Sequence, residues 1–312
     1  MIESKEMRAV CCETLMELAE HDPRIVVLDS DLSSACGTKP FAARFPSRHV
    51  NVGIAEANMI GVAAGMASCG KIPFAYSFAT FASRRCFDQI TVSVGYAKLN
   101  VRIVGTDPGI SAEANGGTHM ALEDVGILRT LPNMLIFEPV DAVQLKAALP
   151  QLVDHDGPLY LRLLRKKADP IFSEGYEFKL GKADHLRDGK DLVIFATGLT
   201  VKYALDAAAE LEKEGISARV INIHTLPLDE AAVLEAAAAT GLVVTVENHS
   251  VIGGLGSAVA ELLGEKLPTP MQRIGIRGTY GEVGTRAYLA ERFGIDAKSI
   301  VAACREAMKK KR

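Results

Sequence analysis

Short apolar runs rich in valine and isoleucine alternate with segments of helical periodicity along the whole chain. Strands of a parallel sheet are continuous apolar runs, because helices cover both of their faces. The alternation therefore predicts the α/β class, with mostly parallel sheets. The expected strands are 25–28, 50–53, 72–77, 101–105, 134–137, 159–164, 192–196, 218–223, 242–247 and 273–276. The expected helices are 5–20, 56–69, 81–95, 118–130, 141–153, 201–214, 229–239, 256–266, 285–293 and 297–309.

A polar stretch interrupts this alternation between residues 166 and 190. It contains lysines, a proline and three glycines, which are typical of turns and connections. A chain of 312 residues is long enough for two domains of about 150 residues each. We therefore expect two three-layer α/β/α domains, 1–165 and 191–312, joined by a linker at 166–190.

The charge balance argues against several partner classes. The chain has 35 basic and 38 acidic residues, a net charge of -3 and no long run of one sign. Neither nucleic acid nor an anionic membrane surface is thus an expected partner. The charged start of the chain lacks the apolar core of a signal peptide, and no apolar run reaches the roughly 18 residues of a membrane span. We expect a cytoplasmic protein.

Three loops at the carboxyl ends of expected strands are candidate sites, because ligands of open parallel sheets bind there. The first leads into a helix rich in glycine and alanine, and Glu56 lies at the start of this helix. Glu56 is either a first-turn acid stabilised by the helix dipole or a buried carboxyl kept partly protonated by desolvation. A buried carboxyl of that kind could share a proton with a heterocycle nitrogen.

The second loop contains Phe78, Phe81 and Phe87, in a chain with only 6% aromatic residues. These rings either fill the core between sheet and helix or form a wall on which a flat ring stacks. Arg84 in the same segment either lines that pocket or faces solvent.

The third loop, residues 105–119, is long and glycine-rich. Thr118 is expected to be an N-cap, which would place His119 in the first turn of a helix at the mouth of the sheet. There the imidazole is either structural or donates a hydrogen bond to substrate oxygens.

Other catalytic and binding motifs are weak or missing. The run Gly253-Gly254-Leu255-Gly256 is similar to a dinucleotide-binding loop, but Val259 stands where a third small residue should allow close helix packing. The six cysteines show neither metal-ligand spacing nor a disulfide pattern. There is no P-loop and no nucleophile elbow. We expect no nucleotide and no metal held by this chain alone.

Taken in order, the three loops resemble the pyrimidine-binding domain of transketolase. The resemblance continues through Ala196-Thr-Gly198, Val246-Glu247-Asn-His249, the glycine run at 253–256 and the segment 275–284. It implies the C-terminal half of a thiamine-diphosphate-dependent transketolase, made as a separate subunit. By resemblance, Glu56 hydrogen-bonds the pyrimidine of the cofactor and drives its amino–imino tautomerism. The rings that pack against the pyrimidine are Phe78 and Phe81, supported by Phe87.

The resemblance also implies substrate contacts. Arg8 and Arg165 match arginines that bind the sugar phosphate, and His119 matches a histidine near the reacting carbons. Three positions depart from the family pattern: Asn115 replaces an aspartate that contacts a sugar hydroxyl, Thr106 replaces a phosphate-contacting histidine, and Ala35 replaces a phosphate-binding serine. Asn115 and Thr106 are still expected to bind the substrate. These departures indicate a donor or acceptor outside the standard pentose phosphates.

A further family motif is missing from the chain. Members of the family bind the diphosphate through Mg²⁺ with a Gly-Asp-Gly segment and a later asparagine, and this sequence contains no Gly-Asp-Gly. The resemblance therefore implies a partner, an N-terminal transketolase subunit that carries the diphosphate and magnesium site. We expect a heterotetramer with two copies of each chain, and no activity of this chain alone.

The implied reaction transfers a two-carbon ketol unit from a ketose phosphate to an aldose. Three alternatives remain open. The beta subunit of a 2-oxo-acid dehydrogenase decarboxylase has the same two domains and an equivalent glutamate. Deoxyxylulose-phosphate synthase shares the Thr118-His119 feature but is normally one continuous chain. A regulatory subunit could keep the fold without catalysis, although retention of the glutamate, the phenylalanines and the histidine argues against it.

Overall fold

The computed structural model describes residues 2, 5–309 and 311. Residues 1, 3, 4, 310 and 312, which include part of the charged start considered above, lie outside the described residues. The described chain divides into two compact units. The first consists of Met1–Pro108 and His119–Leu180, and the second of Gly109–Thr118 and Gly181–Arg312. Within the described part, no helix combines the length and the apolar character needed to cross a membrane.

The first unit contains a parallel sheet with the strand order β5-β6-β4-β3-β1-β2. Its strands are β1 (Ile25–Asp29), β2 (His49–Asn51), β3 (Ile72–Phe78), β4 (Arg102–Thr106), β5 (Leu135–Phe137) and β6 (Leu159–Leu163). Strands β1, β4 and β6 are buried along their whole length. This burial on both faces explains why the strands are continuous apolar runs in the sequence.

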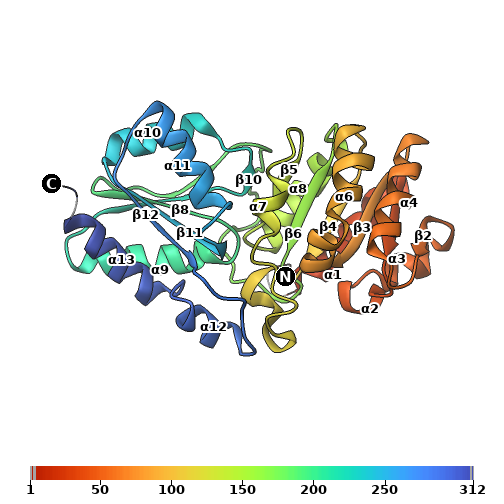
Figure 1. Cartoon of the computed structure of the whole chain (residues 1–312), viewed down its shortest axis with the longest axis horizontal. Helices are drawn as coiled ribbons and strands as arrows, with labels where there is room; N and C mark the ends of the chain where they lie inside the picture. Colours follow the sequence, from red (N-terminus) through yellow and green to blue (C-terminus); the bar gives the residue numbers. More distant parts are fainter. Residues whose placement is uncertain (1, 3–4, 310, 312) are drawn as a thin grey trace. The chain divides into compact units, whose positions relative to one another are not determined.

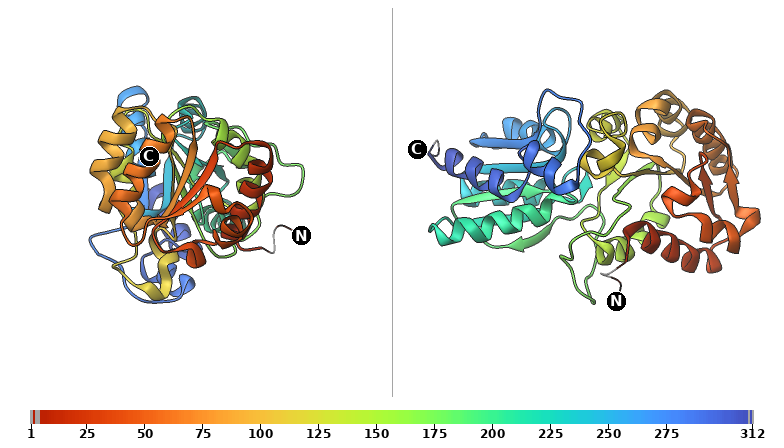
Figure 2. Two further views of the ribbon diagram at one scale, coloured as in Figure 1. Left: turned by 90° about the vertical axis from the view of Figure 1, so that its right-hand side faces the viewer. Right: turned by 90° about the horizontal axis from the view of Figure 1, so that it is seen from below.

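Helices cover both faces of this sheet, as the left panel of Figure 2 shows. Helices α1 (Met7–His21) and α8 (Ala142–Asp154) pack together on one face, and their core includes Leu15, Phe74 and Leu149. Helix α4 (Glu56–Ser68) packs against β3. The shorter helices α2 (Ser33–Cys36), α3 (Lys39–Arg44) and α7 (Asp124–Leu128) were not expected with these bounds. The first unit is thus a three-layer α/β/α domain.

The helix expected at 81–95 is broken into short pieces. They are α5 (Ala79–Ala82), a 3-10 turn at Arg84–Cys86, α6 (Phe87–Gln89) and a π-helical segment at Ile90–Tyr96. Ser83 breaks the helix with φ -112° and ψ -86°, and its hydroxyl donates to the carbonyl of Ala79 at 2.6 Å. Irregular helical turns of this kind are frequent at functional sites.

The predicted start of the helix expected at 118–130 is also wrong. Helix α7 begins at Asp124, and His119 lies in a turn before it. Positive φ angles at Glu113 and Gly116 hold the preceding loop in turn conformations. The start of α7 is anchored by tertiary contacts, because the buried carboxylate of Asp124 accepts hydrogen bonds from Tyr160 and Arg162 on β6. Thr118 therefore does not cap a helix.

The second unit has its own sheet, with the order β12-β11-β8-β9-β7. Strands β8 (Leu192–Ala196), β9 (Ala218–Asn222), β11 (Val243–Ser250) and β12 (Met271–Ile276) are parallel, and β7 (Asp184–Arg187) is antiparallel to β9. A two-residue strand, β10 (Thr225–Leu226), follows β9. Helices α9 (Thr200–Lys213) and α13 (Ala297–Lys309) pack together on one face, and α10 (Glu230–Thr240) and α11 (Leu255–Lys266) cover the other (Figure 1).

The stretch 166–190 does not form a separate linker. Its first part belongs to the first unit, where Asp141 accepts hydrogen bonds from the backbone of Ile171 and Phe172, and Gln151 bonds Phe178 and Leu180. Its last ten residues belong to the second unit and contain β7. Tertiary hydrogen bonds therefore assign the first part of this stretch to the first unit.

Burial of His224 predicts a pH-dependent stability of the second unit. Desolvation lowers the pKa of His224 from 6.5 to about 4. The folded chain therefore holds a neutral imidazole, which the unfolded chain protonates below its ordinary pKa. The neutral imidazole therefore contributes fully to the free energy of unfolding above pH 6.5. This contribution falls by up to about 3 kcal/mol as the pH falls toward 4. Urea unfolding should show a smaller loss between pH 7 and pH 5 in His224→Asn than in the wild type.

The exposed His185 on β7 is a matched control for this titration. A His185→Asn variant should retain the pH dependence of the wild type, because it leaves the buried His224 in place. Equal pH slopes for His224→Asn and the wild type would assign the titration to other groups.

Candidate functional site

The carboxyl ends of β1, β3, β4 and β6 lie at one edge of the first sheet, because these strands are parallel neighbours. Side chains from the loops that follow them, and from the start of α4, meet there. The open carboxyl edge of such a sheet is where ligands bind in α/β domains.

Glu56 is the first residue of α4, and only 2% of it is exposed. Its Oε1 accepts a hydrogen bond from the hydroxyl of Ser77 at 3.3 Å, and Ser77 in turn accepts one from Ser30 at 3.0 Å. Its Oε2 accepts a hydrogen bond from Arg85 at 2.9 Å. The structure thus favours a buried carboxyl over a solvated first-turn acid.

The surroundings of Glu56 are more polar than the apolar pocket expected from the sequence. A guanidinium faces one carboxylate oxygen and a serine hydroxyl the other. The side chain of Arg85 is 44% exposed, so one partner of the ion pair is open to solvent. Its neighbour Arg84 pairs with Glu123 at 2.8 Å instead. The break at Ser83 determines which of the two arginines faces the glutamate, and helical periodicity gave no signal for it.

An aromatic cluster, made of Phe78, Phe81 and His119, lies beside this ion pair. The ring centroids are 6.2 Å apart for the two phenylalanines, 5.8 Å for Phe78 and His119, and 5.2 Å for Phe81 and His119. Arg85 lies 3.9 Å from the centroid of Phe81 and so contacts both the cluster and Glu56. The structure brings these sequence-predicted residues together.

Phe87, the third expected ring, does not belong to the cluster. It is half-buried in α6, and among the described residues it makes no ring contact with the other two phenylalanines. The helix break between residues 82 and 87 separates it from them.

Arg8 and Arg165 form an arginine pair, although they lie at opposite ends of the first unit in sequence. Both guanidiniums donate to the carbonyl of Ala35, at 2.7 Å from Arg8 and 3.3 Å from Arg165. Arg165 also lies 4.7 Å from the ring centroid of Phe78, which places the pair next to the aromatic cluster. An arginine fork is well suited to binding a tetrahedral anion.

Each arginine of the pair has its own carboxylate. Asp107 accepts hydrogen bonds from the backbone and the guanidinium of Arg165, and Glu6 accepts one from Arg8 at 2.8 Å. Asp107 has φ 51°, an unusual conformation for a residue other than glycine. Neither carboxylate was singled out from the sequence, because acidic residues near loops are common. Their contacts with the two arginines follow only from the tertiary structure.

Two of the three departures noted in the sequence lie beside the arginine pair. Thr106 has no exposed surface, and its hydroxyl donates to the carbonyl of Ser77 at 3.2 Å. Thr106, which was expected to bind the substrate, thus donates its hydroxyl hydrogen within the fold. Ala35 contributes its carbonyl to both arginines, so its backbone organises the site even though a hydroxyl is missing.

Asn115, the third departure, belongs to the second unit and is exposed there. Its loop is held by Asn248, whose side-chain oxygen accepts a hydrogen bond from the backbone of Ile110 at 2.9 Å. Gly109 has φ 55°, and a Cβ at this position would lie 2.2 Å from the same oxygen. The asparagine of the Val246–His249 motif thus anchors the loop that carries Asn115.

The glycine run at 253–256 does not form a nucleotide site. The carboxylate of Glu247 accepts hydrogen bonds from the backbone of Leu255 at 2.7 Å and of Gly256 at 2.9 Å, at the N-terminus of α11. It therefore occupies the position at which a dinucleotide phosphate would bind. A Cβ on Gly254 would lie 1.9 Å from this carboxylate. The glycines leave room for the carboxylate of Glu247.

The described residues also contain no group of three or more histidine, cysteine, aspartate or glutamate side chains that could hold a metal ion. The six cysteines are free, and five of them are buried. Burial raises the pKa of the thiol of Cys36, near Thr106, to about 11. The chemistry that the first unit offers is thus that of a buried carboxylate, aromatic rings and paired arginines.

Two family models and two related proteins match this chain over most of its length. Residues 3–170 match the model of the transketolase pyrimidine binding domain, and residues 181–300 that of the transketolase C-terminal domain. The 6-deoxy-6-sulfo-D-fructose transketolase subunit SqwH of Clostridium sp. (strain MSTE9) is 56% identical over 99% of this chain and 97% of its own length. One subunit of the apulose-4-phosphate transketolase of Phocaeicola vulgatus is 38% identical over 96% of both chains.

A solved structure extends the similarity to three dimensions. It is described as a split gene transketolase, an inactive beta4 tetramer, and it superposes with a TM-score of 0.92 at 45% identity. The match covers 99% of this chain and 100% of that one. The two-domain α/β architecture expected from the sequence is therefore shown.

Proposed function

Since the chain belongs to the transketolase family, as the C-terminal subunit of a split enzyme, we propose that it completes a ketol-transferring active site together with an N-terminal subunit. The reaction would move a two-carbon ketol unit from a ketose to an aldose. The observation that carries this proposal is the buried carboxylate of Glu56 next to the aromatic cluster.

The residues present fit the pyrimidine end of thiamine diphosphate, the cofactor of this family. Glu56 would hold a ring nitrogen, and Phe78 and Phe81 would offer flat faces to the ring. Bound cofactor supplies the electron sink needed to break the carbon–carbon bond beside a ketose carbonyl. Ser77 and Arg85 each donate to one oxygen of Glu56, and each carboxylate oxygen has a second acceptor site that a ring nitrogen would use.

The other end of the cofactor requires a second chain under this proposal. The sequence has no Gly-Asp-Gly segment, and the described residues form no metal-binding cluster. We therefore assign the diphosphate and Mg²⁺ site to the N-terminal subunit, in a heterotetramer with two copies of each chain. The related solved structure is described as inactive when four beta chains assemble, which supports the expectation that this chain alone does not turn over substrate.

Reconstitution tests this proposal. The purified chain should show no ketol transfer, and mixing it with its N-terminal partner, thiamine diphosphate and Mg²⁺ should restore it. A coupled assay of aldehyde release from a ketose measures the reaction. Transfer by the chain alone would contradict the assignment, and release of carbon dioxide from a 2-oxo acid would instead indicate a decarboxylase subunit.

The arginine pair supports a substrate with a terminal anion of low charge. Each guanidinium already faces a carboxylate, so Arg8 with Glu6 and Arg165 with Asp107 are together close to neutral. A phosphate monoester carries about -1.5 to -2 charges at neutral pH, whereas a sulfonate carries one. The missing hydroxyl at Ala35 and the buried Thr106 remove further phosphate donors. We propose a sulfonated sugar, as the name of the SqwH relative describes.

Competing sugars test this specificity. The reconstituted complex should have a kcat/KM for 6-deoxy-6-sulfo-D-fructose about tenfold or more above that for xylulose 5-phosphate. A tenfold ratio corresponds to about 1.4 kcal/mol of differential binding. Fructose 6-phosphate is the matched control, since it differs from the sulfosugar in the terminal group. Full activity on the pentose phosphate alone would contradict the sulfonate proposal while leaving ketol transfer intact.

A further inference from the structure

Four small polar side chains form a connected group next to Glu56 in the first unit. This polar network consists of Ser30, Cys36, Ser77 and Thr106. Each of the four residues is buried, with at most 1% of its surface exposed. They come from the end of β1, from α2, from β3 and from β4, so the packing of the sheet and its helices brings them together.

The geometry of the parallel sheet explains why Ser77 faces Glu56. Successive side chains of a strand point to opposite faces. Tyr76 packs in the core with α1 and α8, so Ser77 points to the other face, where α4, which begins at Glu56, packs against β3. In the register of β1 and β3, Asp29 pairs with Tyr76. The residues that follow them, Ser30 and Ser77, therefore lie side by side.

The hydrogen bonds between the two serines and Glu56 run in one direction. A serine hydroxyl has one hydrogen to donate, and that of Ser77 goes to Oε1 of Glu56 at 3.3 Å. The oxygen of Ser77 in turn accepts the hydrogen of Ser30 at 3.0 Å. An ionised carboxylate accepts hydrogen bonds and donates none. The series from Ser30 through Ser77 therefore fits an ionised Glu56.

Thr106 holds the backbone of Ser77 in place. Its hydroxyl hydrogen goes to the carbonyl of Ser77 at 3.2 Å, and its oxygen lies 3.6 Å from Sγ of Cys36. Burial raises the pKa of this thiol to about 11, so the thiol keeps its hydrogen at neutral pH and can donate it to Thr106. Both the side chain and the carbonyl of Ser77 are thus held by buried partners.

The other contact of Glu56 is less suited to fixing its orientation. Arg85 donates to Oε2, but its side chain is 44% exposed. A long exposed side chain loses rotamer freedom when it is held in one position, and such ion pairs contribute little. Ser77 has a short side chain on a buried strand. Its hydroxyl therefore determines the direction in which the carboxyl group points.

We propose that Ser77 is a positioning residue for Glu56, held in place by Ser30 and Thr106. Because Glu56 carries the proton in the proposed function, this role rests on that function. A group that transfers a proton must lie within hydrogen-bond reach of the atom that gains or loses it. A carboxyl group that can rotate loses part of this alignment. Thr106 acts through Ser77 and not by binding the substrate.

Steady-state kinetics of the reconstituted complex test this role. Ser77→Ala should lower kcat about tenfold and leave the KM for the ketose within about twofold, because the alignment of Glu56 is lost and no substrate contact is removed. Thr106→Val replaces only the hydroxyl and should lower kcat about threefold. A raised KM with unchanged kcat in Thr106→Val would assign this residue to the substrate and contradict its place in the network.

A double-mutant cycle tests whether the two serines act in series. Ser30→Ala alone should lower kcat about threefold. It should cause no further loss in a Ser77→Ala background, because Ser30 reaches Glu56 through Ser77. Additive losses would mean two independent structural effects and would overturn the series.

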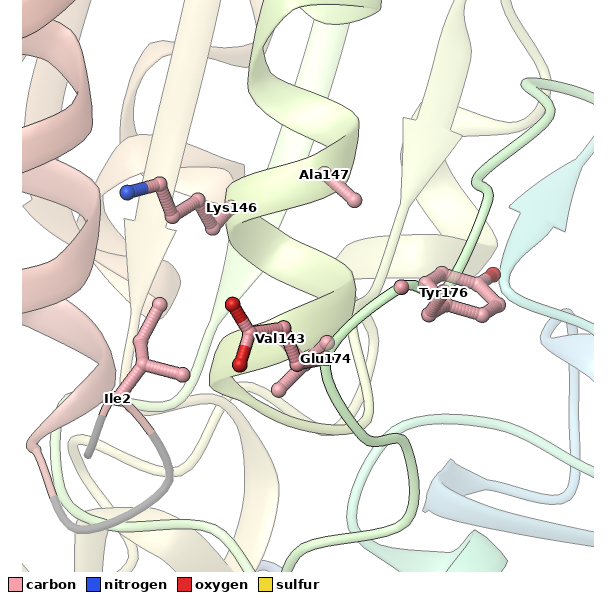
Figure 3. Close-up of a pocket in the computed structure, with 7 residues that line it drawn as sticks. Ile2, Val143, Lys146, Ala147, Glu174 and Tyr176 are labelled. Carbon is pink, nitrogen blue, oxygen red and sulfur yellow. The ribbon is translucent and has the colours of Figure 1, made fainter.

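Two other hydroxyl groups of the first unit provide matched controls. Ser68, at the exposed end of α4, donates to a backbone carbonyl of the same helix at 2.7 Å. Tyr176 accepts a hydrogen bond from Gln144 at 3.1 Å and lines a cavity of about 470 Å³ formed by Ile2, α8 and residues 174–176 (Figure 3). Neither residue contacts the polar network, so Ser68→Ala and Tyr176→Phe should keep kcat within about twofold of the wild type.

Infrared difference spectra of the whole chain give a readout that needs neither the partner nor turnover. In each background, subtracting the spectrum of the Glu56→Gln variant isolates the carboxylate stretch of Glu56. This band should shift in Ser77→Ala, because a hydrogen bond to the carboxylate is lost, and should stay in place in Ser68→Ala. If circular dichroism shows that Ser77→Ala does not fold, the milder Ser30→Ala should shift the band in its place.

The two readouts separate failure of the positioning role from failure of the proposed function. An unshifted band, or a Ser77→Ala complex with the kcat of the wild type, would overturn the positioning role and leave ketol transfer intact. A wild-type complex without ketol transfer would overturn the proposed function, and a shifted band would then show only that Ser77 orients the carboxyl group.

Discussion

Replacing Glu56 with glutamine should lower the kcat of the reconstituted complex by about 100- to 10,000-fold, the usual contribution of a positioned proton-transfer group. The amide has nearly the same shape, and its oxygen can still accept from Ser77 or Arg85. It cannot gain and lose a proton, however. Under the proposed function, the variant should keep the fold and lose the proton relay to the pyrimidine.

Glu123→Gln is the matched control for this experiment. Glu123 also pairs with an arginine of the same segment, Arg84, but its side chain is 37% exposed. We expect kcat within about twofold of the wild type, because exposed ion pairs contribute little. A Glu56→Gln complex with normal turnover would favour a scaffold subunit, since only a catalytic chain depends on that proton.

The second large effect is expected for stability, at Arg102. This side chain is fully buried on β4. Its guanidinium donates to the carbonyls of Leu152 at 2.6 Å, Val153 at 3.1 Å and Gly157 at 2.8 Å, and also to that of His155. These carbonyls belong to the end of α8 and the turn after it, so Arg102 acts as a C-terminal cap for that helix.

Arg102→Met should therefore lower the free energy of unfolding by about 3–5 kcal/mol, because several carbonyls lose a charged donor inside the core. The fall should appear as a lower urea midpoint for the first unit. Arg24→Gln is the control, as this arginine is exposed and pairs only locally with Asp22. An unchanged midpoint for Arg102→Met would mean that the carbonyls find other donors and that the cap is dispensable.

Much of the fold could be predicted because buried parallel strands leave a local signal. Strand β8 was expected with the bounds observed, and the bounds of α4 and α13 differ from the prediction by one residue or less. The predictions failed where tertiary contacts override local preference. Ser83 interrupts a segment with helical periodicity, and Asp124 determines the start of α7 through Tyr160 and Arg162.

The candidate site shows the same division. Glu56, Phe78, Phe81 and His119 were found because each lies in a loop after an apolar strand or at the start of the next helix. Arg85 and Asp107 were not assigned, since their importance lies in which side chain they face. Thr106 was expected to bind the substrate, and the structure shows it buried with its hydroxyl donating to the carbonyl of Ser77.

The sequence by itself determined the α/β class, the order of the two domains, the loops that carry functional groups and the missing Gly-Asp-Gly segment. These properties depend on residue type and on spacing along the chain. Only the tertiary structure decided which charges meet. It brought Arg8 and Arg165 to the carbonyl of Ala35, and it placed Glu247 at the N-terminus of α11. Such contacts join segments far apart in the sequence, so their distances follow from the packing of the whole unit.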